Sequence, residues 1–193
     1  MRVTRERANE NRRRVLEKAG ELFRERGFDG IGVADLMKSV GLTHGAFYGQ
    51  FGSKDELAAE AMADTLTQAA ERWRHRVAAS PDDAFGAIAG YYLSRTHRDA
   101  LANGCPASAL GAETAHQTPA VRRSFTEGTK PLLDILAETV PGGTPEERRA
   151  EALAAFSAMV GAVVLARAVD DPALSDEILA ATRAKFGVRK PEG

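Results

Sequence analysis

Apolar residues recur along this chain at three- and four-residue spacing, which is the period of an amphipathic helix. The first such segment spans residues 9–26, and its apolar positions are Val15, Leu16, Ala19, Leu22 and Phe23. No segment alternates apolar and polar residues over six positions with β-branched residues between turn signals, as a strand would. The pattern therefore predicts an all-α chain of about nine helices.

Capping residues and prolines divide the chain into these helices. Four capping side chains stand directly before a proline, as the N-cap and first helical residue do: Ser80, Thr118, Thr144 and Asp171. Ser53 and Thr144 are each followed three residues later by glutamate, which is the capping-box spacing. We expect helices over 9–26, 33–40, 44–50, 53–79, 81–98, 105–115, 119–139, 145–168 and 172–186. Pro131 should kink or split the helix over 119–139.

Length and composition indicate a soluble globular protein. The 193 residues suffice for one domain or two small ones, and 44% are hydrophobic while 27% are charged. The single cysteine, Cys105, cannot form an intramolecular disulfide. The arginine-rich first residues do not resemble a signal peptide, and the longest uncharged stretch, 152–166, is shorter than a bilayer span. We therefore expect a cytoplasmic protein that does not enter a membrane.

Charge is unevenly distributed along the chain. Residues 1–54 carry eleven Lys and Arg against seven Asp and Glu, whereas the remainder carries 15 against 20. The formal net charge of −1 therefore conceals a basic N-terminal part joined to an acidic remainder. This asymmetry favours a nucleic-acid-binding head, which we place at 1–52, on a larger domain at 53–193.

The predicted helices over 33–40 and 44–50 are joined by Gly41-Leu42-Thr43. Glycine permits a sharp left-handed turn, and Thr43 is expected to cap the second helix. Two short helices joined in this way form a helix-turn-helix, whose second helix places its N-terminal residues in the major groove. Here that helix begins with His44, and the small Gly45 beside it permits close approach to DNA.

At these positions the sequence resembles the TetR/AcrR family of one-component transcriptional regulators. The resemblance covers about the first sixty residues without a gap and rests on Val15-Leu16, Ala19, Leu22-Phe23, Gly27-Phe28, Val33, Asp35-Leu36, Gly41-Leu42, Tyr48, Phe51, Ser53-Lys54 and Leu57. Two later stretches, 103–106 and 163–172, also look like segments found in family members. The resemblance implies a helix-turn-helix head on a helical body that binds a ligand and dimerises.

The resemblance also implies residues that contact operator DNA. It assigns His44 and Gly45 to the bases, and Tyr48 to a phosphate and a thymine methyl group. Thr43 and Gln50 are assigned to the DNA backbone. Lys54 is expected to bind a phosphate together with the free N–H groups at the start of its helix.

Some of these residues have alternative interpretations. Tyr48 and Phe51 can be ordinary core aromatics, which for Phe51 is the better interpretation, and Lys54 can be a solvated side chain. Arg2, Arg5 and Arg7 are candidates for an arm that reaches the DNA, whereas the arginines at 12–14 suit a mixed solvent- and DNA-facing surface. Many family members have a Thr or Ser pair where this chain has Ile31-Gly32, so only backbone N–H groups are expected to contact phosphate there.

The helix over 145–168 carries an alanine every fourth residue, at 150, 154, 158, 162 and 166. Such a ridge lets another helix pack closely. The resemblance implies that this helix and the one over 172–186 pair with their copies in a second subunit. The alternative is packing within the same chain.

We expect the body to bind a small apolar or aromatic effector that releases the DNA. Candidate lining residues come from the middle helices: Leu66, Trp73, Phe85, Tyr91, Tyr92, Leu93, Leu110, His116, Phe125 and Leu132. Tyr92, His97 or His116 would supply polar contacts. Any one of these residues is more often plain core than a ligand contact.

Cys105 offers a second kind of switch. It precedes Pro106 at a predicted helix N-terminus, a position that lowers a thiol pKa, so a reactive thiolate could sense electrophiles or oxidants. The alternative is a buried apolar residue. The histidines and Cys105 lack metal-ligand spacing, and we expect neither a metal nor a cofactor. A helical enzyme or scaffold is the rival class, but the chain has no phosphate loop, paired carboxylates or activated nucleophile.

Overall fold

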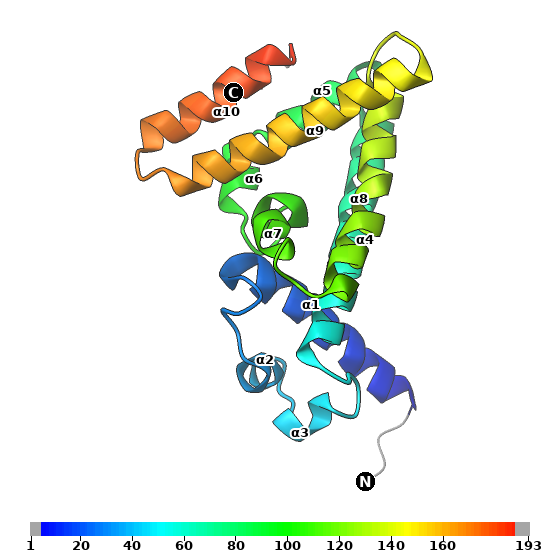
Figure 1. Ribbon diagram of the computed structural model, residues 1–193, viewed down its shortest axis with the longest axis vertical. Helices are drawn as coiled ribbons and strands as arrows, with labels where there is room; N and C mark the ends of the chain where they lie inside the picture. Colours follow the sequence, from blue (N-terminus) through cyan, green and yellow to red (C-terminus); the bar gives the residue numbers. More distant parts are fainter. Residues whose placement is uncertain (1–4, 188–193) are drawn as a thin grey trace.

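The computed structural model describes residues 5–187. This part of the chain is all-α and contains ten α-helices and one 3-10 turn (Figure 1). The elements are α1 (Arg5–Arg26), α2 (Val33–Ser39), α3 (His44–Phe47), α4 (Lys54–Ala79), η1 (Pro81–Asp83), α5 (Ala84–Tyr92), α6 (Arg95–Asp99), α7 (Pro106–Thr114), α8 (Pro119–Thr139), α9 (Pro145–Ala168) and α10 (Pro172–Lys185).

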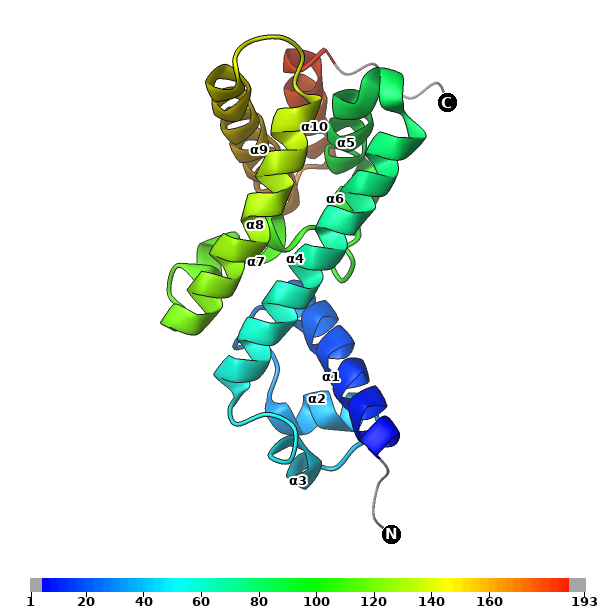
Figure 2. The same cartoon turned by 90° about the vertical axis from the view of Figure 1, so that its right-hand side faces the viewer.

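The helices form a small head, α1–α3, at one end of the molecule and a larger body, α4–α10, above it (Figure 1). The long helix α4 runs from the head to the opposite end and packs along α8, the most extensive helix pair (Figure 2). At that end α9 packs against α8, with α10 beside α9. The apolar residues of both parts form one continuous core.

Three of the expected helix caps are confirmed. Ser53 Oγ accepts from the Glu56 N–H at 3.1 Å, Thr144 forms a complete capping box with Glu147, and Asp171 accepts from the first turn of α10. Ser80 and Thr118 are the N-cap residues before proline, as expected, but their side chains form no cap hydrogen bond.

The single helix expected over 81–98 is also wrong, because that segment forms η1, α5 and α6. The chain breaks at Asp83 and Ser94, whose side chains accept from the backbone N–H groups of Gly86 and His97 and begin new helices. Pro131 does not split α8, which continues from Pro119 to Thr139. The hydrogen bond that proline removes is outweighed there by packing along α4.

At the N-terminus the first helix begins earlier than expected. Arg5 and Arg7 lie in the first turn of α1 and not in an extended arm, while Arg2 lies outside the described residues. The second helix of the helix-turn-helix is shorter than its expected range of 44–50, since α3 ends at Phe47.

Candidate DNA-binding and effector sites

The helix-turn-helix is built on a tight turn and a small aromatic core. Gly41 has φ +72°, a left-handed conformation that glycine adopts without strain, and it reverses the chain between α2 and α3. Beneath the turn, Leu36 and Met37 are buried together with Phe47 and Phe51, whose rings stack with centroids 5.6 Å apart. The core assignment of Phe51 is therefore confirmed.

The opposite side of α3 faces solvent. Thr43, His44 and Gly45 are exposed, and the Tyr48 side chain is 64% exposed. The Tyr48 ring meets the His44 ring edge-on with centroids 5.5 Å apart, so two polar aromatic rings form one surface. A Cβ added at Gly45 would meet nothing within 4 Å, so the surface at Gly45 is open and another molecule can approach the α3 backbone closely. Tyr48 is thus no core residue.

The other predicted DNA contacts lie at the edges of this surface. Gln50 folds back, with Nε2 donating to the Ala46 carbonyl at 3.4 Å, and its Oε1 is buried without a partner. Lys54 begins α4, and its Nζ is 3.9 Å from a carboxylate oxygen of the fully exposed Asp29. Thr43 is the N-cap residue of α3, but its hydroxyl forms no cap hydrogen bond, contrary to expectation.

The departure at Ile31-Gly32 has a clear structural effect. Ile31 is buried in the core, and Gly32 is the N-cap of α2 without a side chain to offer. Only backbone N–H groups are therefore available at the start of α2.

Comparison with known proteins identifies the family of this head. Residues 15–61 match the model of the bacterial regulatory proteins of the tetR family. This segment contains the whole turn, α3 and the start of α4. The head of this chain is therefore a DNA-binding head of the tetR family. The similar proteins are transcriptional regulators and not enzymes, which supports a DNA-binding regulator.

Similar proteins extend the likeness beyond the TetR-family head. The HTH-type transcriptional regulator LmrA of Bacillus subtilis is 26% identical over 161 residues, covering 81% of this chain and 85% of LmrA. The HTH-type transcriptional repressor NemR of Escherichia coli is 22% identical over 138 residues, 70% of this chain and 69% of NemR.

Solved structures show the same fold. The reduced form of E. coli NemR superposes with a TM-score of 0.77 at 20% identity, covering 93% of this chain and 97% of that one. A TetR-family regulator from Agrobacterium tumefaciens superposes with a TM-score of 0.75 at 21% identity, covering 92% and 98%.

In the body, three of the five predicted effector contacts lie together. Trp73 and Tyr92 are buried and meet edge-on with centroids 6.0 Å apart, and Phe156 of α9 completes the cluster. Cys105 is buried close enough to Tyr92 for each to affect the pKa of the other. The Tyr92 hydroxyl is fully buried and forms no hydrogen bond of good geometry.

The other two predicted effector contacts lie elsewhere. His116 is exposed in the turn between α7 and α8, and Phe125 is half-buried against Gly111 of α7. A cleft of about 750 Å³ lies between η1, the α8–α9 turn and the end of α10, and none of the five residues lines it. Of the wider set of candidate lining residues, Phe85 lines this cleft.

Cys105 occupies a site that disfavours a thiolate. Burial raises the pKa of the Cys105 thiol, and this outweighs the lowering effect of nearby hydrogen-bond donors. The expectation that a helix N-terminus would lower this pKa is wrong, because desolvation dominates. The Cys105 N–H donates to His97 Nε2 at 2.9 Å, while His97 Nδ1 lies 2.7 Å from the Tyr92 carbonyl oxygen.

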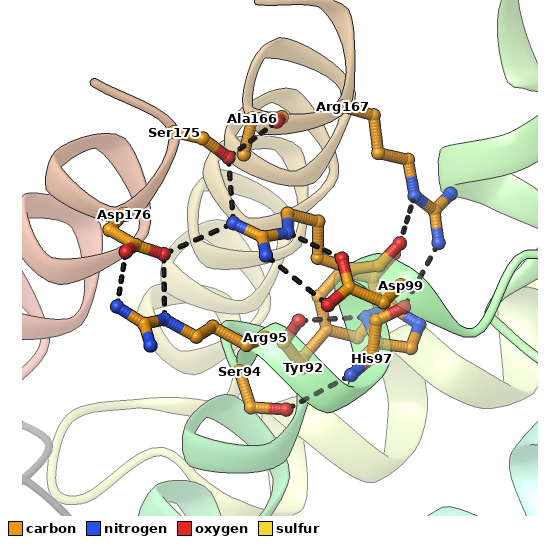
Figure 3. A network of polar contacts seen from close by, with 10 residues as sticks. Tyr92, Ser94, Arg95, His97, Asp99, Ala166, Arg167, Ser175 and Asp176 are labelled. Atoms are coloured by element: carbon orange, nitrogen blue, oxygen red, sulfur yellow. Dashed lines mark hydrogen bonds and ion pairs between the residues drawn. The ribbon is translucent and has the colours of Figure 1, made fainter. Parts of the chain in front are cut away.

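The short helix α6 is tied to the end of α9 and the start of α10 (Figure 3). Arg95 forms a two-pronged ion pair with Asp176 of α10. Arg98 donates to Ser175 Oγ at 2.8 Å and to Asp176 at 3.1 Å. Ser175 in turn donates to the Ala166 carbonyl at 2.6 Å, so the corner between α9 and α10 holds α6 in place.

Arg167 of α9, which is partly buried, adds two hydrogen bonds to the backbone of α6. Its Nε donates to the Arg98 carbonyl at 2.8 Å and its Nη2 to the His97 carbonyl at 3.0 Å (Figure 3). Burial lowers the pKa of Arg167. Its guanidinium satisfies the last carbonyls of a five-residue helix, which has few internal hydrogen bonds of its own.

The segment after α6 contacts the head directly. Arg24 of α1 donates from Nε to the Ala102 carbonyl at 2.6 Å. Glu113 of α7 accepts from the backbone N–H of Phe28 at 3.0 Å. Sequence reasoning missed both contacts, because they join residues 78 and 85 positions apart.

The alanine ridge of α9 divides between two surfaces. Ala162 and Ala166 are buried within the chain, whereas the alanines at 150, 154 and 158 face outward. Exposed Leu153 and Leu165 lie on the same helix. By length and composition alone, α9 is the one helix between residues 5 and 187 that is long and apolar enough to cross a membrane, a test that a core helix of a soluble protein also passes.

Proposed function

We propose that this protein is a sequence-specific repressor that a small molecule releases from its operator. The attachment of the head to the α6–α7 segment carries this proposal, because it gives the body a direct hold on the position of α1. If the α6–α7 segment has one arrangement that suits operator binding and another that does not, an effector that binds the second more tightly lowers operator affinity. The factor by which the effector weakens operator binding equals the factor by which the operator weakens effector binding. The name of the relative NemR supports repression as the mode of control.

The proposed operator surface consists of Thr43, His44, Gly45 and Tyr48 with Lys54 at its edge. His44 and Gly45 read bases, Tyr48 contacts a phosphate and a thymine methyl group, and Lys54 binds a phosphate at the start of α4. The exposure of α3 on its buried aromatic core supports this assignment. Gln50 contacts the DNA through its backbone, since its side chain is turned toward α3.

The proposed effector is apolar or aromatic and enters between the body helices at the Trp73–Tyr92–Cys105 cluster. Aromatic side chains there would stack on such a molecule, and the Tyr92 hydroxyl would supply a polar contact that the protein leaves unmade. His116 and Phe125 are the proposed effector contacts nearer the surface of the body.

The proposed assembly is a cytoplasmic homodimer that pairs through α9 and α10, with each chain divided into a head at 1–52 and a body at 53–193. The apolar outer face of α9 supports this pairing. Two heads are also needed to read two half-sites about 34–36 Å apart.

The first test is a mobility-shift titration of the DNA upstream of the protein's own gene across a salt series. Tight binding that weakens steeply with salt is expected. Tyr48→Ala and Lys54→Ala should stay folded and lose affinity. Equal binding to a random duplex, together with a genome-wide fragment selection that returns nothing, would overturn the proposal.

Covalent sensing at Cys105 is the alternative switch, supported by the nearby Tyr92 hydroxyl, which lowers the pKa of the thiol although burial outweighs this effect. Burial of Cys105 means that the body must open before the thiol reacts. Cys105→Ser separates the two switches, because only the covalent one loses its response.

A further inference from the structure

Three consecutive arginines on α1 have three different environments. Arg12 is half-buried, and its Nη2 lies 2.6 Å from a carboxylate oxygen of Glu60 on α4. Arg14 donates from Nη2 to the Val40 carbonyl at 2.8 Å. Arg13 is 72% exposed, and its only ion pair among the residues from 5 to 187 is with Glu17, at 3.7 Å on the same helix. Arg13 and Arg14 are exposed, as expected of a solvent-facing surface, whereas Arg12 is partly buried.

Arg12 and Arg14 contact the two ends of the segment that carries the recognition helix. Val40 ends α2 immediately before the Gly41 turn. Phe51 follows α3, and the Arg12 guanidinium lies 4.7 Å from the centroid of its ring. Between these two points lies α3, which has only four residues.

A four-residue helix has little stability of its own. The orientation of α3 therefore depends on contacts at its two ends. On one side Phe47 and Phe51 anchor it to the core of the head. On the other side the two arginines join its flanks to α1 and, through Glu60, to α4. A cation over an aromatic ring and an arginine at the last carbonyls of a helix are both stabilising arrangements.

The charge of Arg12 is already neutralised within the protein. Its guanidinium pairs with Glu60 and also lies over the ring of Phe51. An arginine held in this way orients neighbouring groups and does not bind a phosphate.

We propose that Arg12 and Arg14 are positioning residues for operator recognition, which fix the orientation of α3 by holding Val40 and Phe51 without touching the DNA. This inference rests on the proposed role of α3 in operator binding. It extends that role to residues that lie outside the DNA-facing surface.

The decisive variant is Glu60→Ala, because a pure charge effect and a loss of Arg12 positioning would change operator affinity in opposite directions. Removing the negative charge of Glu60, on α4 beside the DNA-binding head, should tighten binding if the charge alone matters. If Arg12 positions α3, losing its partner weakens operator binding about five- to tenfold, the size of a partly exposed ion pair and a cation–π contact together. Alanine maintains the helix propensity of α4.

The measurement is a titration of the full-length dimer with two labelled duplexes, at several salt concentrations. One duplex is the fragment that the wild-type protein selects from a random pool, and the other has a shuffled sequence. Arg12→Gln and Arg14→Gln should lower the selected-to-shuffled affinity ratio while the salt slope stays at the wild-type value. A lost phosphate contact would instead reduce the slope by about 0.9.

Arg13→Gln is the matched control, because it removes the same charge from the same turn of α1. We expect its affinity ratio to stay within about twofold of the wild-type ratio, since charge acts on both duplexes alike. Circular dichroism and thermal unfolding establish that each variant is folded. Arg12→Lys, which preserves the charge and the pairing with Glu60, should recover part of the lost ratio.

The inference is overturned if Glu60→Ala binds the selected duplex as tightly as the wild-type protein or more tightly. It is also overturned if Arg12→Gln reduces the salt slope by about 0.9, the value of one phosphate contact. The same conclusion follows if Arg13→Gln lowers the selected-to-shuffled affinity ratio as much as Arg12→Gln does. A wild-type protein that selects no duplex contradicts the proposed function itself, which distinguishes that failure from these outcomes.

Discussion

The Nε atom of Arg24, in the last turn of α1, lies 2.6 Å from the carbonyl oxygen of Ala102, in the loop between α6 and α7. This hydrogen bond joins the DNA-binding head to the segment that α9 and α10 hold in place (Figure 3). Burial, and secondarily the charge of Arg72, lowers the pKa of Arg24 to about 10. Burial of the charged Arg24 side chain is unfavourable, and its hydrogen bond between the head and the α6–α7 loop offsets part of that cost.

Replacing Arg24 by methionine should loosen this connection with little effect on global stability. The lost hydrogen bond costs about 0.5–1.5 kcal/mol, and relief of the buried charge offsets part of it. We therefore expect the unfolding free energy to change by less than about 1 kcal/mol. Amide hydrogen exchange at residues 100–104 should become faster, as measured by mass spectrometry. Unchanged exchange there would show that Arg24 does not restrain the loop.

Gly27, where α1 ends, should tolerate no side chain. Its φ of +77° is strained for other residues, and an added Cβ would lie 2.7 Å from a carboxylate oxygen of Glu113. Gly27→Ala should lower the unfolding free energy by about 1–3 kcal/mol. Urea denaturation measures this loss.

Gly45→Ala is the matched control for this substitution. Gly45 is helical, and an added Cβ meets open space, so the unfolding free energy should stay constant or rise by up to about 1 kcal/mol. Equal losses for the two variants would contradict the geometric argument. Because Gly45 lies on the proposed operator surface, its variant should still lose operator affinity.

The fold of this chain could be predicted where local signals decide the structure, and not elsewhere. Ser53 and Thr144 cap helices as their spacing with glutamate indicates, since a cap depends on neighbours three residues away. Thr118 stands directly before proline, as Thr144 does, but no glutamate follows three residues later, and its hydroxyl is buried without a partner. Here tertiary packing overrides the local preference.

The same division applies to the sites. The exposure of His44 and Tyr48 follows from the helix-turn-helix pattern, which is local. Burial of Cys105 depends on Tyr92 and His97 from preceding helices, and a helix-terminus argument does not include desolvation. Contacts such as Glu113 to Phe28 have no sequence signal, because an acidic residue on an exposed helix face has many possible partners.

His97 should make stability depend on pH below neutrality. Its side chain is buried and bridges the Tyr92 carbonyl and the Cys105 N–H, so it is neutral, and burial lowers its pKa to about 4. The unfolded histidine has a pKa of about 6.5 and binds its proton first as pH falls. Between these values the unfolded state binds more protons, so stability decreases from pH 6.5 toward pH 4, by on the order of 2–3 kcal/mol.

The check is urea denaturation of the wild-type protein and His97→Gln between pH 7 and pH 4.5. Glutamine can donate to one partner and accept from the other without titrating. The difference in unfolding free energy between the two proteins should therefore narrow or reverse as pH falls. A constant difference would show that His97 is not the titrating group.

Leu165 should be essential for assembly. It is 56% exposed on α9, near Val164 and in line with the outward alanines. Together these residues form an apolar surface whose exposure to water is unfavourable in a monomer. In a symmetric dimer one substitution alters the interface twice, and each buried leucine contributes about 1.5–3 kcal/mol. Leu165→Asp should therefore sediment as a monomer, and it should lose operator affinity because one head reads only one half-site. Leu101, exposed in the loop between α6 and α7 and not on α9, is the control, and Leu101→Asp should remain dimeric. If Leu165→Asp also sediments as a dimer, the subunits pair through another surface and the exposed face of α9 has a different partner.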